Sequence, residues 1–89
     1  MKRIYKYPLE VEDEQIVSLP KGAVLLSVQV QHNQPCLWAK VESNHKNIPH
    51  KIVIHGTGHS ANDVEGMQFL GTFQLQGGNF VGHAFGGAV

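Results

Sequence analysis

The sequence predicts an all-β protein: a small antiparallel β-sandwich or partly open barrel of six to seven short strands, with at most one short helix. Three observations predict this class. Apolar residues recur at every second position along much of the chain, which is the period of a half-buried strand. Gly, Pro and Asn interrupt the alternation at short intervals, as turns between strands do. The 89 residues suffice for one modest core, so residues 1–89 are predicted to form a single β domain.

Two strands are predicted before the first clear turn. Residues 3–9 alternate around two tyrosines, and Pro8 indicates an edge strand or a strand end because proline donates no ladder hydrogen bond. Residues 15–19 form the second strand. The stretch Pro20-Lys21-Gly22 then predicts a turn.

A hairpin is predicted next. Residues 24–30 alternate between apolar and polar types, and the predicted inner face consists of Val24, Leu26, Val28 and Val30. The turn-like stretch 32–35 separates this strand from a second one at residues 37–41. The polar stretch 42–50 is predicted to be a loop.

Three further strands are predicted at residues 52–54, 69–76 and 80–85, the last two joined by a turn at Gly77-Gly78-Asn79. Between the first two of these strands, residues 60–67 leave room for a helix of about two turns. The last strand is expected to place Val81, His83 and Phe85 on one face. The glycine-rich tail 86–89 is expected to be frayed or held by a partner.

Composition excludes several function classes. Seven basic residues balance seven acidic ones, so the electrostatic footprint of a duplex nucleic-acid binder is absent. No apolar run approaches ~18 residues and no signal-peptide pattern is visible, so we expect a cytoplasmic protein without a membrane partner. Cys36 is the lone cysteine, which fits a reducing compartment or a buried small apolar residue.

The stretch IVIHGTGHSA, Ile52 to Ala61, has the spacing of a dinucleotide-binding fingerprint. That motif needs a long helix after the glycines and an acidic residue about 20 positions further on. The chain has no room for the helix and no Asp or Glu after Glu65, so we interpret the stretch as a turn out of a strand. Exposed amides at Gly56 and Gly58, beside Thr57, His59 and Ser60, could form a nest for an anion.

Histidines raise two other interpretations. His45, His50, His55 and His59 could bind zinc, but they lie in a loop and a turn rather than at helical ligand spacing, so no metal and no cofactor is predicted. A small hydrolase that uses His59 or His83 as an acid–base group is a second interpretation. No nucleophile-elbow motif accompanies these residues, so no catalytic residue is assigned.

Several strings in this order resemble a family of short uncharacterised proteins, a domain of unknown function, common in bacteriophages and prophages. The strings are LPKGAVLLSVQVQ, PCLWAKVE, HGTGHS, FLGTFQL and FVGHAF, and the resemblance extends from MKRIYKYPLE to Phe85. It implies a phage-encoded protein in the host-cell cytoplasm. It implies no activity and no cofactor.

Together these observations predict a non-enzymatic, homo-oligomeric binding protein that sequesters a small anionic ligand, such as a cyclic nucleotide of a host defence pathway. The predicted ligand-binding residues are Gly56, Thr57, Gly58, His59, Ser60, Arg3, Trp38 and His83. The alternatives are an inhibitor that binds a host defence protein directly, through a strand edge or Trp38, and the His-dependent hydrolase.

Overall fold

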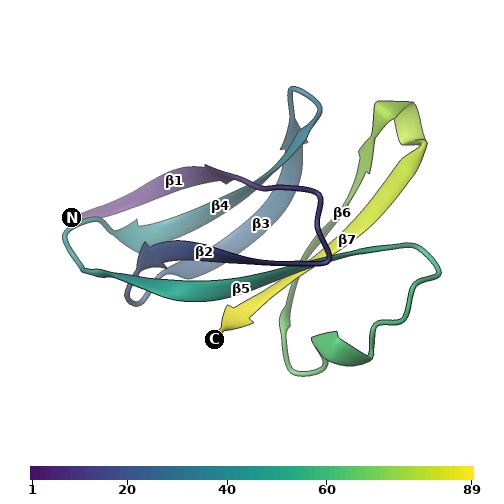
Figure 1. The fold of residues 1–89 in the computed structure, drawn as a ribbon. Helices are drawn as coiled ribbons and strands as arrows, with labels where there is room; N and C mark the ends of the chain where they lie inside the picture. Colours follow the sequence, from purple (N-terminus) through teal and green to yellow (C-terminus); the bar gives the residue numbers. More distant parts are fainter.

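The computed structural model describes residues 1–89 and consists of seven strands in two antiparallel sheets (Figure 1). The three-stranded sheet has the order β1–β4–β3, and the four-stranded sheet has the order β2–β5–β7–β6. The strands are β1 (Lys2–Pro8), β2 (Glu14–Pro20), β3 (Val24–Gln31), β4 (Gln34–Glu42), β5 (Asn47–Gly56), β6 (Gln68–Leu75) and β7 (Phe80–Ala88). The predicted all-β class is therefore confirmed.

The core lies between the two sheets and follows the period of two. Alternate residues of β4, Leu37, Ala39 and Val41, face Ile52 and Ile54 of β5 within one cluster of 13 buried residues. All five side chains are at most 2% exposed. The outer faces of the same strands carry charged residues such as Lys40 and Lys51, together with Trp38 and the buried Val53.

The two sheets meet along one side and stay apart along the other. At the meeting side β3 faces β6, and a side-chain atom added at Gly71 would lie 2.8 Å from the Val28 carbonyl oxygen. Gly71 has a φ of 140°, a conformation that is essentially restricted to glycine. Gln68 Nε2 donates a hydrogen bond of 2.9 Å to the Leu25 carbonyl across the same side. At the opposite side, β1 and β2 are edge strands with no further partner.

The predicted inner face of β3 is wrong in its first half. The register of the β3–β4 ladder shifts between Leu25 and Ser27, which marks a β-bulge. The extra residue moves Leu25 into the core and leaves Val24 and Leu26 48% and 44% exposed. Strict alternation, from which the inner face was predicted, cannot register an inserted residue.

A second bulge between Phe69 and Gly71 has the same effect on β6. Leu70 enters the core, while Phe69 is 56% exposed and its ring packs 5.4 Å from that of Phe85 on the outer face. The two bulges lie on the two strands that face each other, where the sheets approach most closely.

Two further predicted segments also differ. The two-turn helix at residues 60–67 is a single 3₁₀ turn, η1 (Asn62–Val64); the other helical turn is η2 (Gln76–Gly78). The loop predicted at 42–50 is shorter, since β5 already begins at Asn47. No helix of the chain is long and apolar enough to cross a membrane.

The tail predicted to be frayed is part of β7, which pairs with β5 as far as Ala88. Gly86 explains why glycines occur here: an added side-chain atom would lie 2.7 Å from Leu25 Cδ1 and 2.8 Å from Leu70 Cδ1. Gly86 is therefore required by packing against the core, and composition alone does not separate that cause from disorder.

Candidate functional site

The glycine corner, residues 56–60, follows β5 directly and turns back on itself. The His59 amide donates to the Gly56 carbonyl at 3.1 Å, and the Thr57 amide donates to the Val81 carbonyl at 3.3 Å. Gly58 has a φ of 90°, which explains the glycine at that position. The corner is a turn that leads into an irregular loop and an antiparallel strand, as expected, and two of its amides are already used within the protein.

A shallow hollow of about 460 Å³ adjoins the corner. It is lined by Gly56, Thr57, His59, Asn79, Phe80 and Val81. No lysine or arginine lines it. Acidic residues lie nearby, because the Asp13 carbonyl accepts the Ile54 amide two residues before the corner and Asp63 bonds to His55. An anion at the corner would therefore have no lysine or arginine to pair with.

His83 lies on the outer face of the four-stranded sheet and has both ring nitrogens occupied. Its Nε2 lies 2.7 Å from Thr57 Oγ1, and its Nδ1 lies 2.9 Å from Thr72 Oγ1. Thr72 is its cross-strand partner on β6, and Thr57 belongs to the glycine corner. The two threonines hold the ring in place, so neither nitrogen is free to take a proton from a substrate in this arrangement.

His55 is the cross-strand neighbour of His83 on β5 and bonds to the loop that follows the corner. Its Nε2 lies 2.7 Å from Asp63 Oδ1, and this hydrogen bond holds the pKa of the Asp63 carboxyl below its usual value. Sequence analysis did not select this pair. The spacing of eight residues matches no regular element, so only the path of the loop brings the two side chains together.

Three of the four histidines considered for zinc form hydrogen bonds with different partners. His45 bonds to the Lys21 carbonyl, His50 is buried and bonds to the Ile48 carbonyl, and His55 bonds to Asp63. No three His, Cys, Asp or Glu side chains converge in a way that could hold a metal ion.

The structure separates the eight predicted ligand-binding residues into three places. The corner residues Gly56, Thr57, Gly58, His59 and Ser60 lie together, and His83 joins them through Thr57. Trp38 lies opposite Lys6 on the outer face of the three-stranded sheet. Arg3 lies on the edge strand β1, opposite Val41. Within one chain, Arg3 and Trp38 therefore lie apart from the glycine corner.

Charge, neutral in total, is segregated along the molecule. Six of the seven acidic residues lie in the β1–β2 connection, at the start of β2 or in the loop after the corner: Glu10, Glu12, Asp13, Glu14, Asp63 and Glu65. Of the lysines, only Lys51 forms an ion pair with a carboxylate, that of Glu14 at 2.8 Å. Lys2, Lys21, Lys40 and Lys46 lie toward the end of the sandwich that holds the β2–β3 and β4–β5 turns.

Three of these lysines line one hollow of about 290 Å³, which we call the basic hollow. Its lining consists of Lys2, Lys21, Gly22, Val24, Lys40, Val41, Glu42 and His45. The β2–β3 turn forms one wall: Ala23 donates to the Pro20 carbonyl at 3.1 Å, and Gly22 has the positive φ of 85° that a type II turn requires. Lys2 and Lys40 come from the adjacent strands β1 and β4.

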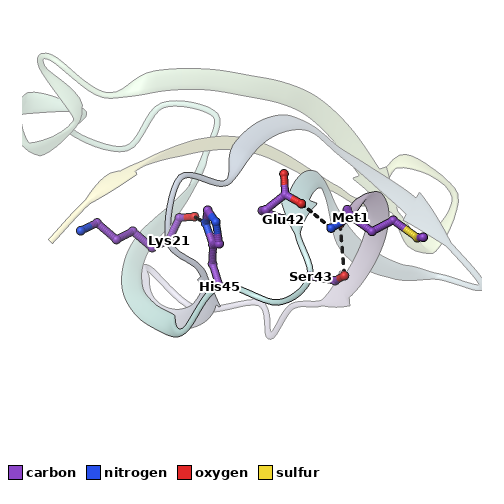
Figure 2. Close-up of polar contacts among 5 residues, drawn as sticks. All are labelled: Met1, Lys21, Glu42, Ser43 and His45. Atoms are coloured by element: carbon purple, nitrogen blue, oxygen red, sulfur yellow. Dashed lines mark hydrogen bonds and ion pairs between the residues drawn. The ribbon is translucent and has the colours of Figure 1, made fainter.

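The one carboxylate of the basic hollow is already bound. Glu42 accepts a hydrogen bond from the Met1 amino group, and Ser43 Oγ bonds to the Met1 carbonyl at 3.1 Å (Figure 2). This hydrogen bond from Met1, with the charge of Lys2 contributing, holds the pKa of Glu42 below its usual value. Figure 2 also shows the Lys21 side chain extending away from Glu42. No lysine of the hollow forms an ion pair with a carboxylate, although Lys2 lies near enough to Glu42 for its charge to act on it.

His45 has a defined orientation in the basic hollow. Its Nδ1 lies 3.0 Å from the Lys21 carbonyl oxygen, and since a carbonyl only accepts, Nδ1 carries the hydrogen. The second nitrogen, Nε2, is then an acceptor in the neutral ring and becomes a donor when the ring is protonated. Sequence analysis missed Lys21 and Lys40 and considered His45 only as a zinc ligand, because the three residues converge from two turns and a central strand.

The fold and its polar surface define the class: a small, two-layered antiparallel β protein with one basic and one acidic region. The chain belongs to the family described as domain of unknown function DUF7352, whose model matches residues 1–89. No curated protein and no solved structure matches the chain.

Proposed function

We propose that this protein is a non-enzymatic binding protein that takes a small anionic, phosphate-bearing ligand in the basic hollow. The observation that carries the proposal is the set of three lysines around one hollow whose only carboxylate is already bound to the Met1 amino group. An anion is the chemical complement of such a site. The glycine corner, which the sequence favoured, has no comparable cation.

The size of the hollow supports a ligand group rather than a whole nucleotide. About 290 Å³ lies at the lower limit of small-molecule pockets, so one or two phosphate groups fit while the rest of the ligand stays on the surface. Because the site is open to water, we expect moderate affinity that falls as salt is added.

The biological part of the proposal follows from the resemblance to phage proteins. In this proposal the chain is phage-encoded, acts in the cytoplasm of the infected cell as a homo-oligomer, and lowers the free concentration of a nucleotide signal of host defence. Its test is expression in cells that carry a cyclic-nucleotide-dependent defence system. Restored phage growth is expected, and the loss of that effect in a lysine variant of the basic hollow would tie it to ligand binding.

Calorimetric titration with pyrophosphate and with a cyclic dinucleotide tests the site. Changing Lys2 or Lys40 to Gln should weaken binding about tenfold per lysine, the worth of one charge-assisted contact of ~1.4 kcal/mol. The matched control is Lys51→Gln, since Lys51 lies outside the hollow beside Glu14. Equal affinities for all variants would refute the basic hollow as the site.

Recovery of the ligand separates binding from the hydrolase alternative. After incubation and heat denaturation, an intact nucleotide is expected. A changed nucleotide, together with loss of the change in His59→Ala or His83→Ala, would establish catalysis instead. A tight stoichiometric complex with a host defence protein, formed without any nucleotide, would favour the direct inhibitor.

A further inference from the structure

The fold leaves four strand edges, and the structure distinguishes them. The edges of β3 and β6 face each other where the two sheets meet. The edges of β1 and β2 have no strand beyond them (Figure 1). An unpaired edge presents N–H and C=O groups that can pair with another strand, and proteins usually block it with Lys, Pro or a bulge.

The hydrogen-bond register shows which residues at each edge direct their backbone N–H and C=O groups away from the sheet. In an antiparallel ladder, alternate residues bond to the neighbour and the others point away. On β1, Leu9 donates to the Pro35 carbonyl and the Met1 carbonyl accepts from Ser43, so odd-numbered residues face β4. The outward residues of β1 are therefore Lys2, Ile4, Lys6 and Pro8. Two lysines and a proline block this edge.

The β2 edge is protected by proline only at its last residue. Ile54 donates to the Asp13 carbonyl and Lys21 donates to the Lys46 carbonyl, so odd-numbered residues face β5. The outward backbone groups belong to Glu14, Ile16, Ser18 and the terminal Pro20. None of the first three is lysine, proline or part of a bulge, and Ile16 is a large apolar residue that is 56% exposed.

The charges at the two ends of β2 favour one direction of pairing between two copies of this strand. The start of β2 is acidic, with Glu12, Asp13 and Glu14, whereas its end is basic, with Lys21 and the adjacent Lys46. When two copies of such a strand pair antiparallel, the acidic start of each lies beside the basic end of the other. Parallel pairing would bring like charges together.

We infer that β2 is a self-association edge, through which a second copy of this chain pairs antiparallel about a two-fold axis at Ile16. The pairing joins the two four-stranded sheets into one continuous sheet and closes as an isologous dimer. In this register Ile16 lies opposite Ile16 of the partner subunit, and Glu14 lies opposite Ser18 of the partner subunit. The inference specifies the homo-oligomer of the proposed function but does not depend on the ligand.

The expected dimer is weak. The edge offers about six intermolecular hydrogen bonds, which corresponds to an interface of roughly 600–1,200 Å². Interfaces at this lower limit form reversible complexes. The dimer should therefore appear and disappear with protein concentration, and raised salt should weaken it because two acidic–basic contacts contribute.

Cysteine cross-linking tests the register directly. In the proposed pair the two residues at position 16 have Cα atoms about 5.5 Å apart, which suits a disulfide. Ile16→Cys should therefore cross-link at least about tenfold faster than Ser18→Cys, whose two copies lie about 13 Å apart. Native Cys36 is buried and does not interfere. Equal cross-linking of the two variants would overturn the inference.

Sedimentation analysis over a range of concentrations, without ligand, is the second measurement. Ile16→Lys should weaken dimerisation about tenfold or more by placing two lysines on the axis, while Ile4→Lys on the blocked edge should leave it unchanged. Circular dichroism checks that both variants fold. A wild-type monomer at all concentrations, or a dimer that Ile16→Lys does not weaken, would overturn the inference. Anion binding by the Ile16→Lys monomer tests the proposed function separately.

Discussion

The histidines on the outer face of the four-stranded sheet show how neighbours of one residue type take different roles. His83 is held between Thr57 and Thr72, so its ring fixes the glycine corner to β6 and β7. His55 beside it bonds to Asp63 and fixes the loop that follows. Both are most simply explained as residues that attach the loop to the sheet. The alternation of β7 predicted that His83 shares a face with Val81 and Phe85, but neither that this is the outer face nor that two hydroxyl groups bond to the ring.

The Asp63 carboxylate gives a prediction in pH. Its pKa is lowered in the folded protein by the hydrogen bond from His55, so its stabilising contribution is present above its ordinary pKa and is lost as pH falls through the folded value. Asp63→Asn should lower the unfolding temperature by a few degrees or less near neutral pH, since the pair is exposed. The difference from wild type should shrink as pH falls below the ordinary Asp pKa of about 3.9 and vanish below the lower folded pKa.

Thermal unfolding of the two proteins between acidic and neutral pH checks this. Glu65→Gln, in the same loop but without a hydrogen-bond partner among the side-chain contacts, is the matched control. A difference that persists unchanged into strong acid would show that the carboxylate charge plays no part.

At the scale of elements, the two facing bulges decide which apolar residues enter the core. Each strand has one bulge, between Leu25 and Ser27 on β3 and between Phe69 and Gly71 on β6. Because a bulge inserts one residue, the side chains before and after it follow opposite alternations between the two faces of the sheet. Gly71 permits the close approach because it has no side chain. An added Cβ atom would lie 2.8 Å from the Val28 carbonyl oxygen, and the φ of 140° also disfavours any other residue. In the sequence, Gly71 is only one of several residues on the face that alternation predicts to be apolar, and nothing there indicates the close approach.

Gly71→Ala should therefore destabilise the protein by about 2–4 kcal/mol, from backbone strain and a clash with a main-chain oxygen that cannot move freely. The control is Gly77→Ala, where φ is also positive at 65° but no atom lies within 4 Å. That change should cost only about 1 kcal/mol. Urea unfolding measures both. An equal loss of unfolding free energy in the two variants would mean that the close approach of β3 to β6 does not restrict the residue at position 71.

At the scale of the whole molecule, a chain without net charge places its positive and negative residues in different regions of the fold. The seven positive and seven negative residues cancel in number, yet four of the five lysines without an ion pair lie toward one end and most carboxylates lie elsewhere. Net charge reports the balance of the two signs but cannot report how the charges are arranged in space. The basic hollow and the polar β2 edge both arise from this arrangement.

The two proposals share Lys21, which lines the hollow and also follows the end of β2. An anion in the hollow and the acidic segment of a partner subunit would compete for its charge. By linkage, saturating pyrophosphate should weaken dimerisation, and dimerisation should weaken anion binding by the same factor, expected to be about twofold to tenfold. Sedimentation with and without pyrophosphate measures the first effect. Stronger dimerisation with the anion would contradict shared use of Lys21.

The sequence by itself determined the all-β class, most strand positions, the turn at Lys21-Gly22 and the exclusion of a cofactor helix after the glycine corner. These depend on local properties: side-chain period, the φ preferences of Gly and Pro, and the length of chain between motifs. Tertiary structure alone decided the bulges, the pairing of β7 as far as Ala88, the His55–Asp63 contact and the gathering of lysines in the basic hollow. Each of these depends on contacts between residues far apart in the chain, which no local pattern records.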